Sequence, residues 1–331
     1  MKPSIIYQNS LTTLIAILID SIIGDPQKIY NKIPHPVVGI GKWIGLLDDY
    51  FNKPNITEQK QLQNGKIALG FILGLPVGLA LGLTNGFNRF FPFTKSTLLL
   101  GTLSSTLIAQ RSLYKHVECV AIALEHQDIK QARFAVSQIV GRQTDCLDES
   151  GISRAAIESL AENFSDGITA PILWSFIGGF PGLVTYKTIN TADSMIGHFT
   201  QRYRYFGRAA AKVDDWVNLP ASRLSAFWIM LASNQFKKRS QIAKEAKTHR
   251  SPNAGWPEAA MAFGAHIYLG GPRHYAEETV SAPWMGQGRK MLGAKDIRNC
   301  LKIFRNACFF QAFFLTITTI FLCKNNKLSK K

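Results

Sequence analysis

Two glutamates one helical turn apart stand near the middle of the chain, at Glu158 and Glu162, and Arg154 precedes them by another turn. Residues at i, i+4 and i+8 share one face of a helix. On a bare surface, two glutamates at this spacing repel each other by roughly 0.2–0.5 kcal/mol. A bound cation such as Mg²⁺ would turn that repulsion into a binding site, and a solvated acidic face is the alternative. Residues 163–167, which include Asp166, predict the end of this helix.

A second group of candidates follows the first apolar segment. Asp25 stands between Gly24 and Pro26, so its carboxylate is predicted to lie on a rigid turn that could hold a metal ion or a substrate amine. His35 precedes Pro36 a few residues later. The alternative is that Asp25 bonds to its own backbone as a turn former and that His35 belongs to a plain extended segment.

A polar stripe is predicted near the mouth of a later apolar segment. If residues 190–197 are helical, three polar side chains share a face: Asn190, Asp193 and Ser194. Arginine and aromatic residues alternate soon after it, at Arg202, Tyr203, Arg204 and Arg208. Guanidinium groups clamp phosphate oxygens through paired hydrogen bonds. We therefore expect this stretch to bind a phosphate on a substrate, with a lipid headgroup as the alternative.

Two further segments carry acids in useful positions. Asp214 and Asp215 are a candidate pair of Mg²⁺ ligands, although an acid pair at the start of a helix has the same pattern. Residues 249–258 hold two prolines and a glycine around Asn253 and Glu258, which predicts a fixed loop ahead of a helix of small residues. Neither the phosphate-loop motif nor the dinucleotide-binding glycine motif occurs.

The composition limits the classes of protein that could carry these residues. The chain has 331 residues, with 38 Lys and Arg against 22 Asp and Glu, a formal net charge of +16. Hydrophobic residues make up 46% and charged residues 18%, which excludes a disordered chain. The five cysteines show no C-x-x-C spacing, so a zinc ribbon and a disulfide framework have no support.

Long uncharged segments predict membrane helices. Residues 67–84 and 306–323 are uncharged over 18 residues each, close to the length that crosses a bilayer. Residues 11–23 and 96–109 are further expected spans, whereas 168–190 and 219–233 are left open as spans or re-entrant segments. A buried helix of a soluble protein is the alternative. The predicted fold is all-α: one polytopic integral membrane helical domain over residues 1–331, with long helical cytoplasmic loops.

Glycines give two finer expectations about these helices. Every fourth residue from Gly70 to Gly82 is glycine, which predicts a face where a neighbouring helix packs closely. Residues 178–182 are rich in glycine and proline, which favours a bent helix within 168–190.

The distribution of basic residues predicts an orientation. The segments 24–66, 111–167 and 234–300 hold 6, 6 and 11 Lys or Arg residues, whereas the short loop 85–95 holds two. Because basic loops stay on the cytoplasmic side, these segments are expected inside a multi-pass protein of the cell inner membrane. This topology accounts for the positive charge, so we expect contact with membrane lipid and no nucleic-acid partner.

Taken together, these stretches resemble the adenosylcobinamide-phosphate synthase family of cobalamin biosynthesis, the CobD/CbiB type of integral membrane protein. The matching residues are spread in family order from Asp20 to residue 272. They are Asp20, Gly24-Asp25-Pro26, His35-Pro36-Val37, Glu158 to Asn163, Asp166-Gly167, Ala170-Pro171, Asn190-Thr191, Asp193-Ser194-Met195, Arg202-Tyr203, Phe206-Gly207, Asp214-Asp215, Ser251 to Gly255 and Pro257 to Met261.

The resemblance implies an ATP-dependent ligase that joins the carboxylate of a corrinoid, adenosylcobyric acid, to the amine of aminopropanol phosphate, or of free aminopropanol, as an amide. ATP would activate the carboxylate as an acyl phosphate, and Mg²⁺ on carboxylates such as Asp25, Glu158 or Asp214 would neutralise the transferring phosphate. The arginines 202, 204 and 208 would hold a phosphate. His35 or a glutamate would take the proton of the ammonium.

Two other classes of function compete with this reading. A corrinoid transporter would show a repeated bundle with polar residues at the midplane, whereas here the polar residues gather in long loops and no internal repeat is found. A non-catalytic membrane scaffold for other corrinoid-assembly enzymes would explain the basic loops, but not the paired acids beside arginines.

Overall fold

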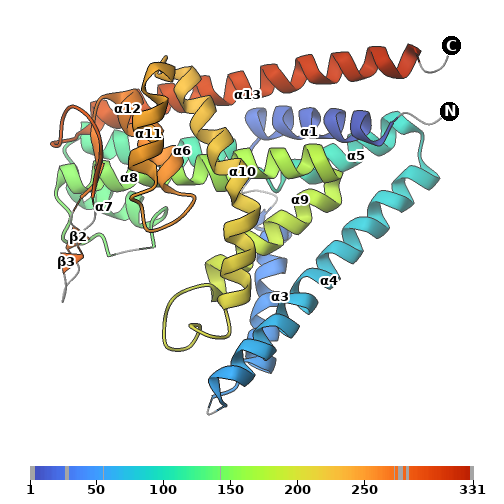
Figure 1. Ribbon diagram of the computed structural model, residues 1–331. Coiled ribbons are helices and arrows are strands. Elements are labelled where there is room, and N and C mark those ends of the chain that lie inside the picture. Colours follow the sequence, from blue (N-terminus) through green and yellow to red (C-terminus); the bar gives the residue numbers. More distant parts are fainter. Residues whose placement is uncertain are drawn as a thin grey trace. The chain divides into compact units, whose positions relative to one another are not determined.

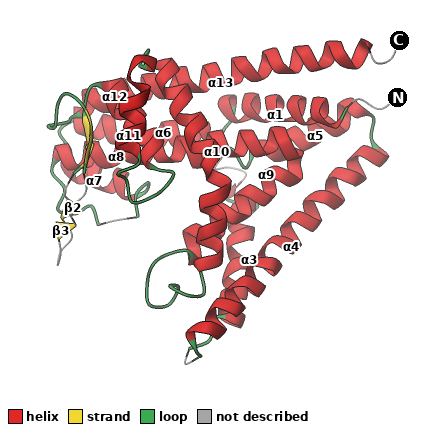
Figure 2. Ribbon diagram, viewed as in Figure 1, coloured by secondary structure: helices red, strands yellow, loops and turns green. Residues whose placement is uncertain are grey.

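The structure is a computed structural model that describes residues 4–26, 30–54, 56–141, 143–271, 273–274, 279–280 and 283–328. Helices form nearly all of it, as Figures 1 and 2 show, so the predicted all-α class is confirmed. The chain divides into two compact units. Unit 1 comprises Met1–Ala109, Ala170–Asn218 and Leu315–Lys331; unit 2 comprises Gln110–Thr169 and Leu219–Phe314.

Unit 1 is built around the helix α9. Its complete helices are α1 (Ile5–Ile22), α3 (Pro36–Phe51), α4 (Glu58–Phe90), α5 (Phe93–Ser105) and α9 (Ala170–Ile196). It also holds the first part of α10 (Arg208–Ala232) and the last part of α13 (Ala294–Leu328). Helices α1, α3, α4 and α5 all contact α9, and α3 and α4 also pack against each other (Figure 1).

Side-chain caps set where several of these helices begin. The Ser4 and Thr57 hydroxyls accept the backbone N–H groups of Tyr7 and Lys60 at the starts of α1 and α4. Such caps satisfy N–H groups that have no partner within the helix. At α3 the cap is the imidazole of His35, followed by Pro36 at the first helical position, where a missing N–H costs nothing.

Glycines explain both the close contacts and the open faces of α4 and α9. A Cβ at Gly65 would strike the backbone carbonyl of Phe206, within the apolar cluster that Ile44, Ile72 and Ala192 share with that ring. The glycines at 70, 74, 78 and 82 have open space where a Cβ would stand. The prediction that this face packs against a neighbouring helix is therefore wrong within the described chain.

The bend expected within residues 168–190 is confirmed. Helix α9 contains a kink at Gly179, whose φ of +63° belongs to the left-handed region that favours glycine. The side-chain oxygen of Asn9 on α1 occupies the space where a Cβ would point. Contact between α1 and α9 thus depends on glycine at this position.

Unit 2 is a separate group of mostly shorter helices with two small sheets. The helices are α6 (Gln110–Glu125), α7 (Ile129–Ser137), α8 (Glu149–Phe164), α11 (Arg239–Ala246) and α12 (Gly255–Ala265), with a 3₁₀ turn at Phe236–Lys238 and the remainders of α10 and α13. Strand β1 (Tyr268–Gly270) pairs antiparallel with β4 (Trp284–Gly286), and β2 (Arg273–His274) with β3 (Thr279–Val280).

The helix end expected at residues 163–167 is confirmed for α8, but no loop follows it. Helix α8 ends at Phe164, and one π-helical turn, η1 (Ser165–Thr169), leads directly into α9. Ser165, Gly167 and Ile168 are buried, so packing overrides the local signals of Asn163 and Gly167. Single π turns of this kind occur often at functional sites.

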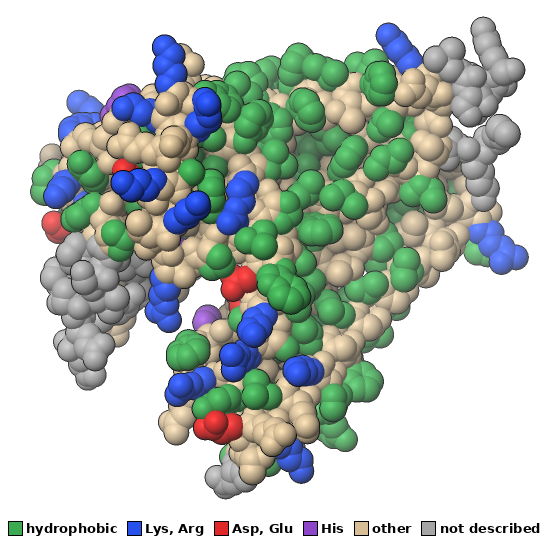
Figure 3. Space-filling view, viewed as in Figure 1, with side chains coloured by type: hydrophobic (Ala, Val, Ile, Leu, Met, Phe, Trp, Pro, Cys, Tyr) green, Lys and Arg blue, Asp and Glu red, His purple; other side chains and the backbone are tan. Residues whose placement is uncertain are grey.

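Four helical segments in the described chain are long and apolar enough to cross a membrane. They are Ile5–Ile22, Glu58–Phe90, Glu149–Ile196 and Ala294–Asn326. Hydrophobic side chains run along the visible face of α4 in Figure 3, and Phe71, Leu75 and Leu79 are among those exposed. The expected span 96–109 corresponds to α5, which has only 13 residues and is not among the four. The segment 219–233 lies in α10, which is not among them either.

Candidate functional site

Three aspartates form a carboxylate cluster in unit 1: Asp193 on α9 and Asp214 and Asp215 on α10. The Asn218 amide donates to Asp214 Oδ2 at 2.9 Å, and the Tyr186 hydroxyl donates to Asn218 Oδ1 at 2.9 Å. Asn218 and Tyr186 are almost fully buried, so this chain of hydrogen bonds fixes the Asp214 carboxylate. The sequence analysis missed both residues.

Burial and neighbouring negative charge both act on the carboxylates of the cluster. Burial, followed by the negative charge of Asp193, raises the pKa of Asp214 to about 7, although hydrogen bonds from Asn218 and Asn190 oppose the shift. Burial also raises the pKa of Asp215. Within the described residues, no three His, Cys, Asp or Glu side chains are grouped so that they could hold a metal ion. A metal bound here would therefore need oxygen ligands from water or substrate as well.

The remaining residues of the polar stripe have different surroundings. A Cβ at Gly197 would collide with the Asp193 carboxylate, so glycine is needed for Asp193 to keep its position. The Ser194 hydroxyl is exposed and donates to the Asn190 carbonyl of its own helix at 2.9 Å. The structure thus joins Asn190 and Asp193 to the cluster through Asp214, whereas Ser194 bonds to its own helix.

The arginines predicted to bind phosphate are not equivalent. Arg202 Nη2 lies 2.7 Å from Asp48 Oδ2, which also accepts from the Tyr203 hydroxyl at 3.1 Å. Asp48 is buried on α3 and was missed by the sequence analysis. A phosphate at Arg202 would have to compete with this carboxylate. Arg204 lies over the rings of Phe199 and Tyr205, and Arg208 is exposed at the start of α10.

The turn and the histidine before α3 come together. His35 Nε2 lies 3.5 Å from Asp25 Oδ1, and His35 Nδ1 accepts the Val37 N–H at 3.2 Å. A ring nitrogen that accepts a hydrogen bond is unprotonated, so the neutral ring carries its proton on Nε2, which faces Asp25. This arrangement suits positioning of Asp25 better than removal of a proton by His35.

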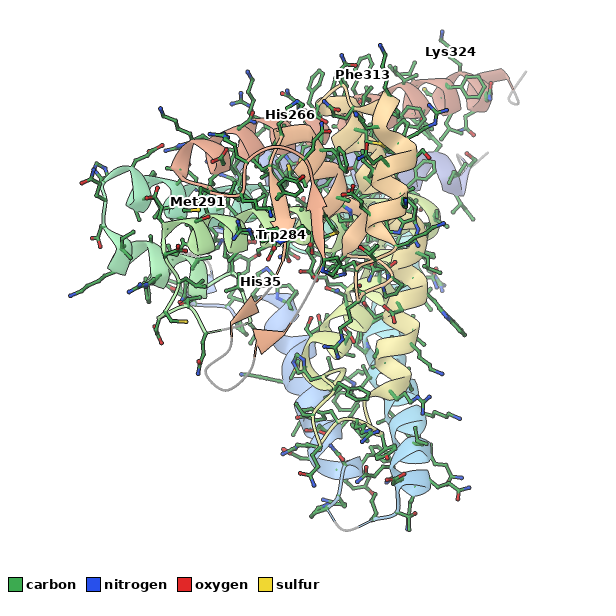
Figure 4. The ribbon with its side chains drawn as sticks, turned by 60° about the vertical axis from the view of Figure 1, so that its left-hand side comes forward. His35, His266, Trp284, Met291, Phe313 and Lys324 are labelled. Atoms are coloured by element: carbon green, nitrogen blue, oxygen red, sulfur yellow. The ribbon has the colours of Figure 1, made fainter. Side chains whose placement is uncertain are left out.

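In unit 2, Arg154 and Glu158 on α8 both face strand β1. Glu158 is buried, and its Oε1 accepts the Gly270 N–H at 2.9 Å. Arg154 donates to the carbonyls of Tyr268 and Lys290 and lies 4.9 Å from the ring of Trp284, which Figure 4 labels. Glu162, the other acid of the predicted face, is exposed, and the candidate Asp166 is partly buried within η1.

The loop before α12 holds the other candidates of unit 2. His249 Nε2 lies 3.8 Å from Oε1 of Glu258, and Glu258 is only 2% exposed. The Ser251 N–H lies 3.0 Å from His249 Nδ1, closer than the Ser251 carbonyl at 3.4 Å, which again favours an Nε2 proton facing the acid. Asn253 is buried and accepts from Arg223 and Ser222.

Most of the side-chain partners that the sequence analysis missed are distant in sequence from the residues they contact. Asp48 meets Arg202, Asn218 meets Tyr186, and Arg223 meets Asn253. The pair of acids at 48–49 was a visible signal, but it stood in an ordinary amphipathic helix. Only the fold shows which arginine it neutralises.

The predicted site residues all lie within one stretch that matches a known protein family. Residues 13–304 match the family described as CobD/Cbib protein. The chain belongs to the CobD/CbiB family. Its curated relatives include the "Cobalamin biosynthesis protein CobD" of Brucella anthropi, 44% identical over 299 residues that cover 88% of this chain and 90% of the relative.

Two further CobD proteins agree with this membership. The protein of Sinorhizobium fredii is 43% identical and the protein of Rhizobium meliloti 40% identical, with 90% and 92% of this chain covered. The alignments cover 93% and 94% of those relatives. No solved structure matches the chain. All three relatives are named for cobalamin biosynthesis, and both units of the chain fall mainly within the family match.

Proposed function

We propose that this protein forms an amide between a carboxylate of adenosylcobyric acid and the amine of aminopropanol, phosphorylated or free, in cobalamin biosynthesis. The match to the CobD/CbiB family over residues 13–304 is the observation that carries the proposal. The side chains of the described residues also suit this reaction, because buried carboxylates and oriented arginines occur in each unit.

The reaction has two requirements that protein side chains must meet. A carboxylate is a poor acyl donor at neutral pH, so ATP would supply the phosphoryl group that makes it reactive. The amine is protonated in water and must lose a proton before it can attack. Oxyanions and leaving phosphate must also be held while charge moves.

The carboxylate cluster fits a magnesium ion that accompanies ATP. Mg²⁺ is commonly bound by one or two protein carboxylates, with water and phosphate oxygens completing its coordination. Asp214 is buried, and burial followed by the charge of Asp193 disfavours its ionised form, so a nearby Mg²⁺ would stabilise the ionised carboxylate. Asp214 and Asp215 would hold the ion, and Asn218 would keep Asp214 in place.

Glu258 fits the role of the proton acceptor. Its carboxylate is buried and faces the Nε2 proton of His249, so the acid is held in one orientation. Glu158 is fixed differently, because the Gly270 N–H binds its Oε1. We assign proton removal to Glu258 and an organising role in unit 2 to Glu158.

We place this protein in the cell inner membrane. The four apolar helices are of spanning length, and Lys and Arg gather in the segments 111–167 and 234–300. By the positive-inside rule these segments face the cytoplasm, where ATP is available.

The test is amide formation by the purified protein alone. The protein in detergent would receive adenosylcobyric acid, Mg·ATP and either aminopropanol phosphate or aminopropanol, and mass spectrometry would follow the corrinoid. We expect the mass of the amide only when ATP is present, and loss of product in Asp214→Asn. Asp128→Asn is the matched control, because Asp128 caps α7 through Gln131 and asparagine caps equally well. No product with either amine would contradict the proposal.

A further inference from the structure

Arg223 on α10 is the centre of a fixed polar arrangement in unit 2. Its Nη1 donates to Asn253 Oδ1 at 2.9 Å, to Ser222 Oγ at 2.8 Å and to the Leu219 carbonyl at 3.2 Å. The guanidinium carbon lies 4.6 Å from the centroid of the Trp256 ring. Ser222 and Asn253 are both buried, so one edge and one face of the guanidinium group are held.

Among the residues that the structure describes, no carboxylate balances the charge of Arg223. Three arginines of the described chain form ion pairs: Arg202 with Asp48, Arg289 with Asp296, and Arg298 with Glu118 and Glu125. Arg223 forms no ion pair within the described residues, and no hydrogen bond from its Nε or Nη2 is found there. All its protein acceptors are neutral oxygens, and all are bound through Nη1.

Partial burial increases the stabilisation that Arg223 would gain from a bound anion. Arg223 is partly buried, and burial lowers the pKa of its guanidinium group. A desolvated cation gains more from an anion than a solvated one does. Stacking on Trp256 fixes the plane of the group, and a planar guanidinium presents two parallel N–H groups to an oxyanion.

We propose that Arg223, oriented by Asn253, Ser222 and Trp256, binds a phosphate group of a substrate through its free edge. This inference rests on the proposed function, which supplies two phosphate sources, ATP and the phosphorylated amine. A phosphate fits better than the reacting corrinoid carboxylate, because a guanidinium clamp would withdraw charge from the oxygen that must attack. The sequence-based choice of Arg202 is less suitable, since Asp48 already neutralises it.

Direct binding measurements test the site without turnover. Radiolabelled aminopropanol phosphate and radiolabelled ATP would each be dialysed to equilibrium against the full-length protein in a phosphate-free detergent. In Arg223→Lys, which keeps the charge but loses the fork and the stacked plane, we expect affinity for one of the two ligands to fall about tenfold or more. Arg250→Lys is the matched control, since Arg250 is exposed in the same unit and no side-chain hydrogen bond or ion pair links it to another described residue; its affinities should equal those of the wild type.

Further arms separate a binding role from a structural one and identify the source. Asn253→Asp would place a carboxylate against Arg223 and should weaken the same ligand as Arg223→Lys. The melting temperature of Arg223→Lys should stay within a few degrees of wild type. Weaker binding of aminopropanol phosphate, with unchanged binding of unphosphorylated aminopropanol, assigns the site to the amine substrate. Weaker binding of ATP alone assigns it to the nucleotide.

The inference and the proposed function can fail separately. If both phosphate ligands bind Arg223→Lys as tightly as wild type, or if only vesicles of phosphatidylglycerol distinguish the two proteins, the substrate site at Arg223 is excluded even though amide formation is observed. If phosphate binding depends on Arg223 but no amide forms with either amine, the site stands and the amide ligase is wrong.

Discussion

At the residue scale, two histidines hold two acids by the same device. His35 and His249 each accept, at Nδ1, the backbone N–H of the residue two positions later. Each then directs Nε2 at a carboxylate, Asp25 in one case and Glu258 in the other. An imidazole bound in this way orients its neighbour and is a poor proton acceptor. Catalytic work is therefore expected of the acids rather than of the histidines.

Replacing Glu258 with glutamine tests this division of roles. Glu258→Gln keeps the shape of the side chain but cannot take a proton, so the rate of amide formation should fall by about 10²–10⁴-fold. His249→Asn should reduce the rate less, because the acid remains and only its orientation is loosened. Initial rates at saturating substrates measure both. A fully active Glu258→Gln would contradict the role of Glu258 as proton acceptor.

The raised pKa of Asp214 predicts a pH dependence of stability. With a folded-state pKa of about 7 against an ordinary 3.8, the folded protein holds a proton over this range that the unfolded chain has lost. Stability without metal should therefore fall as pH rises from 4 to 7. Melting temperatures of the metal-free protein at pH 5 and pH 8 measure this, and wild type should lose a few degrees more than Asp214→Asn. Equal losses would show that Asp214 is not the titrating group.

Adding Mg²⁺ provides the complementary measurement. An ion on the carboxylate cluster favours ionised Asp214, so it should raise the melting temperature at pH 8 and have little effect at pH 5. Asp214→Asn should show no rise at either pH. A rise of equal size in Asp214→Asn would place the ion elsewhere.

Individual site residues could be predicted from sequence only as far as local spacing carries information. The acids at 158, 193, 214 and 258 could be chosen as candidates, since each stands in a segment with an unusual density of polar groups. Asp48, Asn218 and Arg223 were not assigned, because their importance comes from contacts with residues at least 30 positions away. The same absence of long-range information led to the choice of Arg202, whose charge Asp48 compensates.

At the element scale, glycines decide which helices approach closely. Gly65 and Gly74 both lie in α4, but only Gly65 has a backbone carbonyl, that of Phe206, where a Cβ would stand. The regular spacing from Gly70 to Gly82 could be seen in the sequence, whereas the lone Gly65 could not be singled out. A repeated glycine pattern indicates a helix face made of small residues, and the fold determines whether another helix packs against that face.

These two glycines form a matched pair of variants. Gly65→Ala should destabilise unit 1, since the new methyl group must push Phe206 away, and the protein should melt several degrees lower. Gly74→Ala adds a methyl group in open space and removes backbone freedom, so it should be neutral or stabilising by about 0.5–1 kcal/mol. Thermal unfolding in detergent compares them. Equal effects of the two substitutions would contradict the close contact at Gly65.

The junction between α8 and α9 shows why local stop signals can mislead. Asn163, Asp166 and Gly167 are typical of a helix end, yet the chain continues through η1 into α9. Ile168 and Thr169 are buried, so the backbone N–H and C=O groups of a loop would have no water to bond to here. A continued helix pairs these groups with one another. In contrast, the bend at Gly179 was predictable, since glycine and proline there act directly on the backbone.

At the scale of the whole molecule, the apolar helices indicate a membrane protein, and the basic segments predict its orientation. The all-α class and the long apolar helices at 67–84 and 306–323 could be read from uninterrupted hydropathy. The division into two units could not, because each unit combines segments that are distant in sequence, such as Gln110–Thr169 with Leu219–Phe314. Topology with respect to the membrane remains a prediction from charge.

Cysteine labelling tests that topology. Cys146 is exposed in the segment predicted to be cytoplasmic, between α7 and α8. In a variant with Cys146 as its single cysteine, a membrane-impermeant maleimide should label inverted membrane vesicles and not intact cells. Labelling from outside the cell would contradict the cytoplasmic position of residues 111–167.

The most direct measurement of the central claim follows oxygen from the corrinoid carboxylate. Adenosylcobyric acid carrying a heavy-oxygen label in that carboxylate would be incubated with the purified protein, aminopropanol phosphate and Mg·ATP. If ATP activates the carboxylate as an acyl phosphate, attack by the amine releases inorganic phosphate that contains one labelled oxygen, and the other stays in the amide. Labelled phosphate is expected in equal amount to the amide product. Amide formed without ATP, or with no label in phosphate, would contradict this mechanism.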